Sequence, residues 1–156
     1  GSLGVIQAAQ VAGLLYVWRN VAQVVVSFPI GALADRFGHM PTLVAGYVLG
    51  VLTAVLTAVA FVLHSDSFVF LGVIFLVAGL YMAVQEALES TVTAEMVGND
   101  LLATAVGALG TVNGTAKFIS STMVGVLWTA ISPVFSFGLA AALMAAGTVV
   151  LLRTNR

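Results

Sequence analysis

Ionisable side chains are rare in this chain, and four of them interrupt long apolar runs. Only 7% of the 156 residues are charged, yet Arg19 and Lys117 fall near the middle of such runs, and Glu86 and Glu89 lie in the inner half of another. A charge at the centre of a bilayer costs about 2.5–3.5 kcal/mol on insertion scales. We therefore expect these groups to face a bundle interior or a watery cavity, where they form acid–base pairs. Ionisable groups at this depth serve ion or substrate pathways, and the alternative is a static pair that only orients helices.

Uncharged polar residues recur beside these charges at helical spacing. Asn20 and Gln23 share one helix face next to Arg19, and Asn113 precedes Lys117 by one turn. The positions are those expected for side chains that line a common polar surface. We predict a substrate or ion pathway lined by Arg19, Asn20, Gln23, Glu86, Glu89, Asn113 and Lys117.

The two glutamates of this set have different expected roles. Glu86 lies deeper and is the better candidate for exchanging a proton or coupling to a substrate. Glu89 lies nearer the end of the run and can instead bind a loop or cap a neighbouring helix. The two carboxylates stand at i and i+3 without matching histidines, so a carboxylate-bridged metal centre is not expected.

The composition is that of a membrane protein and excludes several other classes. Sixty-one per cent of the residues are hydrophobic and the mean hydropathy is +1.15, so lipid rather than water has to cover the exterior. A net charge of −1 provides no basic surface for nucleic acid. Cysteine is absent and the two histidines lie in opposite loops, which excludes disulfides and conventional metal sites. No phosphate-binding or nucleophile motif occurs, and we expect neither an enzyme nor a cofactor.

Apolar runs long enough to cross a bilayer, about 20 residues each, recur five times. We predict an all-α integral membrane helix bundle with five transmembrane helices, forming a single transmembrane domain over residues 1–156. A membrane barrel would instead need short alternating segments. The second and fifth helices carry no charge and are expected to face lipid, whereas the other three line a polar interior. The helices are expected at 3–33, 42–63, 67–93, 101–131 and 133–152.

Particular residues predict where these helices begin and end, and paired glycines predict where two helices pack closely. Gly38 can stop the first helix in a left-handed conformation, and Pro41 suits the first turn of the second. Glycines four residues apart, at 46–50 and at 110–114, permit close contact between helices. Serine, aspartate or asparagine N-caps are expected at 65–67, 99–100 and 132.

A short polar turn, Gly31-Ala-Leu-Ala-Asp-Arg-Phe-Gly38, joins the first two spans and places an acid beside a base. It resembles the loop signature of the major facilitator superfamily of transporters, Gly-x-Leu-Ala-Asp-Arg-x-Gly-Arg-Arg, except that His39-Met40 replaces the two final arginines. Three later segments resemble the last part of bacterial efflux-type carriers of this superfamily. They are 87–97, 104–114 and 118–133. The likeness covers nearly the whole chain, as helices eight to twelve of a twelve-helix carrier.

This resemblance implies a partial half of the facilitator fold and therefore a fragment of a larger carrier, as a chain that begins Gly-Ser without Met also suggests. It implies secondary active transport of a small organic solute by alternating access, driven by protons, in the form of efflux or antiport. It also implies a cytoplasmic gate motif formed by Gly31, Asp35, Arg36 and Gly38. Asp35 would accept hydrogen bonds from helix-end N–H groups or pair with a nearby cation. Arg36 could equally extend to lipid headgroups.

Basic residues gather on one side of the five predicted crossings, which places the 31–41 loop and the C-terminus in the cytoplasm. The resemblance to bacterial carriers adds the inner membrane as the location. Expected partners are the lipid bilayer, a small-molecule solute, protons and the remaining helices of the carrier, with no nucleic acid. The alternative is a non-transporting module, a truncated relic or accessory subunit whose polar stripes serve assembly.

Overall fold

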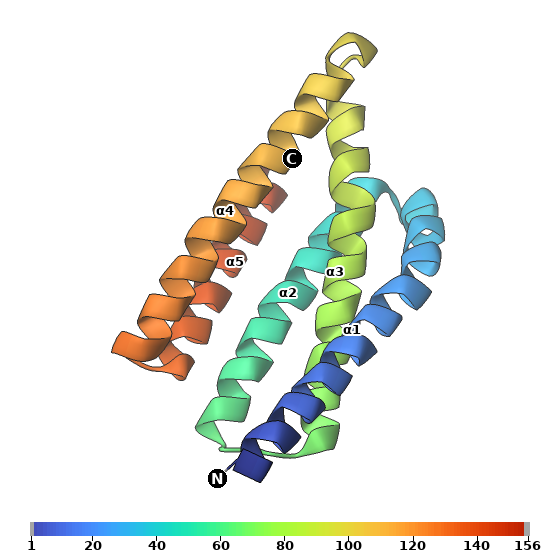
Figure 1. Ribbon diagram of the computed structural model, residues 1–156. Coiled ribbons are helices and arrows are strands. Elements are labelled where there is room, and N and C mark those ends of the chain that lie inside the picture. The colour runs from blue at the N-terminus through green and yellow to red at the C-terminus, as the bar shows by residue number, and fades with distance from the viewer. Residues whose placement is uncertain (1, 155–156) are drawn as a thin grey trace.

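The computed structural model describes residues 2–154 and, within them, all side chains except those of residues 2, 3, 5, 99 and 154. The chain folds into long helices joined by short connections, with no strand among the described residues (Figure 1). The all-α prediction with five long helices is therefore confirmed. The elements are α1 (Ser2–Phe37), α2 (His39–Val62), α3 (Phe68–Met96), the 3-10 turn η1 (Asn99–Leu101), α4 (Leu102–Ala130) and α5 (Pro133–Thr154).

The connection between α1 and α2 is shorter than the sequence predicted. The expected polar turn continues as α-helix to Phe37, so Asp35 and Arg36 lie in the last turn of α1 rather than in a loop. Alanine and leucine at 32–34 are strong helix formers, which explains why the helix does not end at Gly31. Gly38 alone separates the two helices. Its φ is 96° and its N–H donates to the Ala34 carbonyl at 2.8 Å, which confirms the predicted left-handed stop.

Serine side chains cap two of the helices as predicted. The Ser67 hydroxyl accepts a hydrogen bond from the N–H of Phe70 at 3.4 Å, and Ser132 accepts one from Phe135 at 3.1 Å. The cap predicted at 99–100 is wrong. Those residues belong to η1, and α4 begins after Leu101, which makes no side-chain capping bond.

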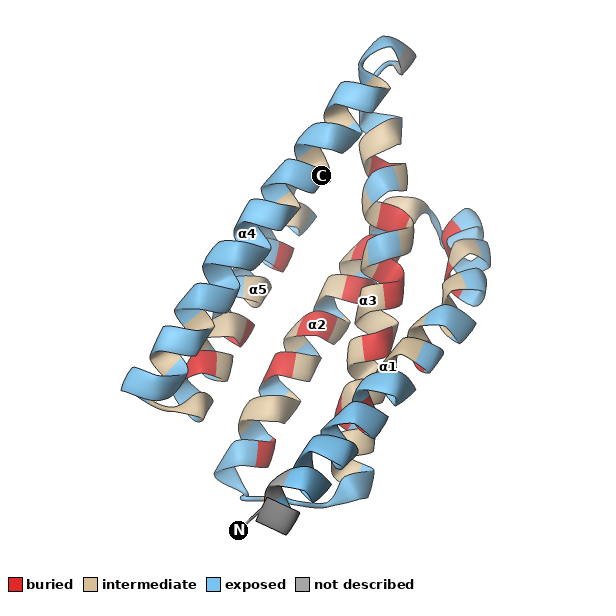
Figure 2. Cartoon of the chain, viewed as in Figure 1, coloured by how far each residue is buried: buried red, intermediate tan, exposed pale blue. Residues whose placement is uncertain are grey.

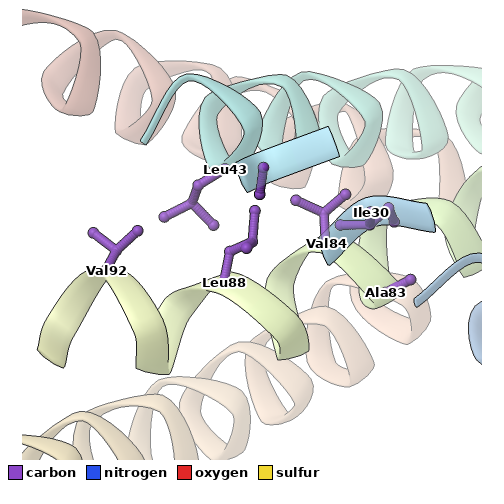
Figure 3. Close-up of a cluster of buried hydrophobic side chains, with 7 residues drawn as sticks. Ile30, Leu43, Ala83, Val84, Leu88 and Val92 are labelled. Atoms are coloured by element: carbon purple, nitrogen blue, oxygen red, sulfur yellow. The ribbon is translucent and has the colours of Figure 1, made fainter. Parts of the chain in front are cut away.

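The buried core lies where α1, α2 and α3 meet. Buried residues gather along α2 and α3, with α1 packed on α3 and α5 packed on α2 (Figure 2). Close packing of these apolar side chains fixes the rotation of each helix about its own axis, and therefore which polar groups face one another. The core cluster consists of Ile30, Ala34, Leu43, Ala83, Val84, Leu88 and Val92, most of which Figure 3 labels.

Small residues on α2 explain its central position. We expected this uncharged helix to face lipid, but it lies between α3 and α5 and buries one face. A Cβ atom on Gly46 would collide with the Val84 side chain, and one on Gly50 would lie 3.0 Å from the Tyr81 ring. The prediction of close contact at 46–50 is confirmed. At 110–114 an added Cβ would meet no described atom within 4 Å, so close contact does not occur there.

The helix α4 is the most exposed of the long helices among the described residues. None of its described side chains is buried, and Figure 1 shows it nearest to α3 close to η1 and diverging from it further along. Within the described residues, the other four long helices have the length and apolar character needed to cross a membrane. α4 is as long as α3, with 29 residues each, but glycine, threonine, serine, Asn113 and Lys117 make it less apolar.

Candidate functional site

The first polar contact of the site joins α1 to α3. The Gln23 side-chain amide donates through Nε2 to Oε2 of Glu86 at 2.6 Å. Close approach of the two helices makes this possible, because a Cβ on Gly79 would lie only 2.8 Å from the Arg19 carbonyl oxygen. Glu86 itself remains exposed, and Oε1 of Gln23 is buried without a hydrogen-bond partner among the described residues. The pair therefore combines an accessible carboxylate with an amide that has an unused acceptor.

The second polar contact joins three helices at Glu89. Asn113 on α4 donates through Nδ2 to Oε2 of Glu89 at 2.6 Å, and the Tyr47 hydroxyl on α2 donates to its Oε1. The Tyr47 ring in turn stands 6.3 Å from the Tyr81 ring, centroid to centroid, at an interplanar angle of 52°. Glu89 is thus bound by neutral donors on both oxygens. Tyr47 was not among the predicted site residues, and its spacing along α2 gave no signal for this role.

Arg19 and Lys117 do not form the acid–base pairs that we expected. Arg19 donates to Oδ1 of its neighbour Asn20 at 3.2 Å and lies 4.9 Å above the Tyr16 ring, all on α1. Lys117 is exposed, and within the described part of the chain neither cation makes an ion pair. The divergence of α4 from α3 explains this for Lys117, which lies one turn beyond Asn113. The structure therefore brings Gln23 to Glu86 and Asn113 to Glu89, but not the cations to the acids.

A charged cluster ties together the helix ends near Gly38. Nε2 of His39 lies 3.4 Å from Oδ1 of Asp35, and Nδ1 of His39 lies 2.6 Å from Oε1 of Glu95. The imidazole thus bridges the last turn of α1 to the last turn of α3. Arg36 points elsewhere, with its guanidinium 5.6 Å from the Phe37 ring centroid. Within the predicted gate motif, Asp35 has the His39 imidazole as its partner, and this partner is a cation when the imidazole is protonated.

His39 and Glu95 were absent from the predicted gate. The spacing of Asp35 and His39, four residues apart, was the available sequence signal, because such residues lie on the same helix face. No local pattern could have indicated Glu95, which comes from another helix. Gly31, another residue of the predicted gate motif, lies inside α1, where an added Cβ would meet nothing within 4 Å.

A cavity of about 520 Å³ lies between α2, α3, α4 and α5. Its polar lining includes Glu89, Asn113, Tyr47 and Tyr81, and the rest is mainly aliphatic and methionine side chains. Arg19, Gln23, Glu86 and Lys117 do not line it. The predicted pathway residues therefore fall into two groups, and only one of them opens into this cavity. No group of His, Asp and Glu suited to a metal ion occurs in residues 2–154.

Comparisons with known proteins agree with this membrane helix bundle. A family model described as Major Facilitator Superfamily matches residues 3–156. An uncharacterised MFS-type transporter of Methanocaldococcus jannaschii is 32% identical over 124 residues. The match covers 79% of this chain and 29% of that protein, so the chain spans less than a third of the relative's length. No solved structure matches the chain.

Proposed function

Because the chain belongs to the Major Facilitator Superfamily, we propose that it forms part of a secondary active transporter that moves a small organic solute by alternating access. Carriers of this kind bind their solute near the bilayer midplane and expose it to each side in turn. The proposed solute pathway follows the polar surface shared by α1 and α3. The observation that carries the proposal is the contact between Gln23 and the exposed Glu86 carboxylate.

The Gln23–Glu86 pair supports proton coupling because it can persist in both protonation states. A Glu86 carboxylate without a proton can accept from Nε2 of Gln23, in the 2.6 Å contact that the two side chains make. A protonated Glu86 becomes a donor, and Oε1 of Gln23 is an acceptor without a present partner. After rotation of the amide, the same two side chains can form a hydrogen bond with the proton on Glu86. A solute and a proton would then alternate at this carboxylate, which is the requirement for antiport.

The charged cluster at the α1–α2 joint supports a gate at the cytoplasmic side. Asp35, His39 and Glu95 connect the ends of three helices, and an opening movement has to separate them. Arg36 and Arg153 occupy helix last turns, and positive charge favours the cytoplasmic face. We therefore assign this end and the C-terminus to the cytoplasm of a cell whose plasma membrane holds the carrier.

Substitution of Glu86 by glutamine tests the coupling role. Proteoliposomes of the complete protein, loaded with the pH dye pyranine, report proton movement when members of a solute panel are added, and the most active solute serves as the probe. We expect Glu86→Gln to reduce solute-driven proton flux by about 100-fold or more, because glutamine cannot release a proton. Asp100→Asn, which removes an exposed carboxylate in η1, is the matched control and should leave the flux unchanged.

Two outcomes would contradict the proposal at different levels. Undiminished flux in Glu86→Gln would remove this carboxylate from coupling while leaving transport itself in place. Absence of flux for every solute in the folded wild-type protein, with the pH gradient imposed in either direction, would instead favour the non-transporting module.

A further inference from the structure

The cavity between α2, α3, α4 and α5 has the features of a second ligand site, separate from the α1–α3 surface. Its volume of about 520 Å³ lies within the range of about 300–1,000 Å³ typical of small-molecule pockets. Most of its lining is apolar, and two of its polar side chains, Tyr47 and Asn113, donate to the Glu89 carboxylate. A ligand that fits would have an apolar body and one polar group.

No cationic side chain among the described residues forms an ion pair with the Glu89 carboxylate. Both oxygens of Glu89 accept hydrogen bonds, but the donors are the neutral Tyr47 hydroxyl and Asn113 amide. Lys117 and Arg19 make no ion pair with it. Neutral donors orient a carboxylate but leave its charge uncompensated, and an ionised group at membrane depth requires such compensation. A carboxylate also has about four lone-pair sites, so it can accept from a further group.

The walls around Glu89 also favour a cation. Tyr47 and Tyr81 both line the cavity with their rings 6.3 Å apart, and the face of an aromatic ring attracts a positive charge. Met40, Met96 and Met144 contribute flexible and polarisable surface, which adapts to ligands of different shape.

We propose that this cavity binds a lipophilic molecule with one positive centre, which lies at Glu89 beside Tyr47 and Tyr81, and with its apolar groups against the methionines. The site lies outside the Gln23–Glu86 pathway and does not depend on the coupling role of Glu86. The positive centre can belong to a free organic cation or to the ammonium headgroup of a zwitterionic lipid, because both can place a positive charge beside Glu89.

Binding of tetraphenylphosphonium to the complete protein in nanodiscs tests the site. We expect Glu89→Gln to weaken binding by about tenfold or more, since glutamine keeps the planar shape of the side chain but removes the charge and one of the two acceptor oxygens. Neutral triphenylphosphine oxide should bind the wild type and Glu89→Gln equally. Equal binding of tetraphenylphosphonium to both proteins would overturn the proposal.

A pair of glycines on α5 supplies a test that leaves Glu89 intact. Gly147 lines the cavity, whereas Gly138 does not, and a Cβ at either position would meet nothing within 4 Å. Gly147→Leu should fill the cavity and weaken tetraphenylphosphonium binding by about tenfold, while Gly138→Leu should change it less than about twofold. Leucine raises helix propensity at both sites, so the two variants are matched in that respect. Equal binding by the two variants would place the ligand elsewhere and refute the cavity site.

Glu86→Gln separates this site from the proposed transport function. Binding retained in Glu86→Gln, even if its proton flux is lost, supports two distinct sites. Binding lost in both Glu86→Gln and Glu89→Gln would locate the cation on a shared polar surface and overturn the separate cavity site. Nanodiscs of phosphatidylglycerol with and without phosphatidylethanolamine identify the natural source. Competition by phosphatidylethanolamine indicates an amine-bearing lipid, and unchanged affinity indicates a free lipophilic cation.

Discussion

Glu86 and Glu89 lie three residues apart on α3, yet the fold gives them different surroundings. Glu86 is exposed and has one amide partner, Gln23 from α1. Glu89 is half-buried, is bound by a tyrosine from α2 and an asparagine from α4, and lines a cavity. We propose proton exchange only for the first carboxylate, whereas the contacts of the second connect three helices. Because an α-helix has about 3.6 residues per turn, two side chains three residues apart point in directions that differ by roughly 60° around the helix axis. This difference is enough for the two carboxylates to meet different neighbours.

The different contacts of the two glutamates predict that the two regions respond differently to substitution. The contacts of Glu89 connect three helices, so its removal affects the packing of α2 and α4 as well as α3. The contact of Glu86 connects only α1 and α3, which are already held together through Gly79 and the core cluster. The Glu89 region should therefore respond to substitutions mainly in stability, and the Glu86 region mainly in transport.

The largest expected effect on stability comes from separating α2 and α3 at Gly46. Leucine at this position would overlap the Val84 side chain, push the helices apart and break the Tyr47–Glu89 contact. We expect Gly46→Leu to lower the free energy of unfolding by about 3 kcal/mol or more, measured by denaturation in mixed micelles. Gly110→Leu is the matched control because its Cβ meets open space. Similar decreases in unfolding free energy in both variants would mean that close packing at Gly46 does not contribute to stability.

Alanine substitution of the two carboxylates gives the most direct comparison. Glu89→Ala leaves the Tyr47 hydroxyl and the Asn113 amide without their acceptor, which should cost about 1–3 kcal/mol of unfolding free energy. Glu86→Ala releases only Gln23 and should cost about 0.6 kcal/mol, an average for polar contacts in membrane helices. Thermal denaturation of the two variants under the same conditions shows which of them loses more stability. A larger loss for Glu86→Ala would reverse our assignment of the structural role.

A double-mutant cycle measures the Tyr47–Glu89 contact on its own. Tyr47→Phe removes one hydroxyl and Glu89→Gln removes the charge, and the double variant shows whether the two losses are independent. We expect an interaction free energy of about 1–1.5 kcal/mol, toward the upper end for membrane interiors because the acceptor is charged. The corresponding cycle for Gln23→Leu and Glu86→Gln should give less. Additive losses in the first cycle would argue against a strong tyrosine–carboxylate bond.

The smallest expected effect concerns the charged cluster at the helix ends. Asp35→Asn removes one of the two carboxylates beside His39 and should loosen the ends of α1 and α3. Val92→Cys, placed in the buried core cluster of a protein without natural cysteine, reports this opening by its rate of maleimide labelling. We expect Asp35→Asn to increase the rate about two- to fivefold, as an exposed ion pair contributes little. An unchanged rate would exclude Asp35 from the gate.

Local features of the fold were predictable because they depend on residues close together in the chain. The apolar runs predicted five helices, Ser67 and Ser132 predicted two caps, and Gly38 predicted the left-handed stop. The joint at 31–37 was mispredicted as a turn because its polar residues resemble a loop, although its alanines and leucine sustain a helix.

The partners of the site residues were less predictable. The seven residues predicted to line a pathway were chosen from charge and helical spacing, and among the described residues Arg19 and Lys117 do not form the ion pairs expected of them. Gln23 and Asn113 bind the carboxylates instead, and Tyr47 completes the second contact. A charged residue inside an apolar run signals that a partner is needed, but many donors at the right depth could supply it.

The sequence alone therefore determined that this is a membrane helix bundle, which residues are polar at depth, and where most helices end. These properties follow from hydrophobicity and from hydrogen bonding within one or two turns of the backbone. The tertiary structure decided which carboxylate faces the α1 surface and which faces the cavity. That choice depends on how close neighbouring helices can approach, which is set by Gly46, Gly50 and Gly79 against side chains and backbone of other helices. Contacts between distant segments have no signature within either segment, and so only the folded arrangement fixes them.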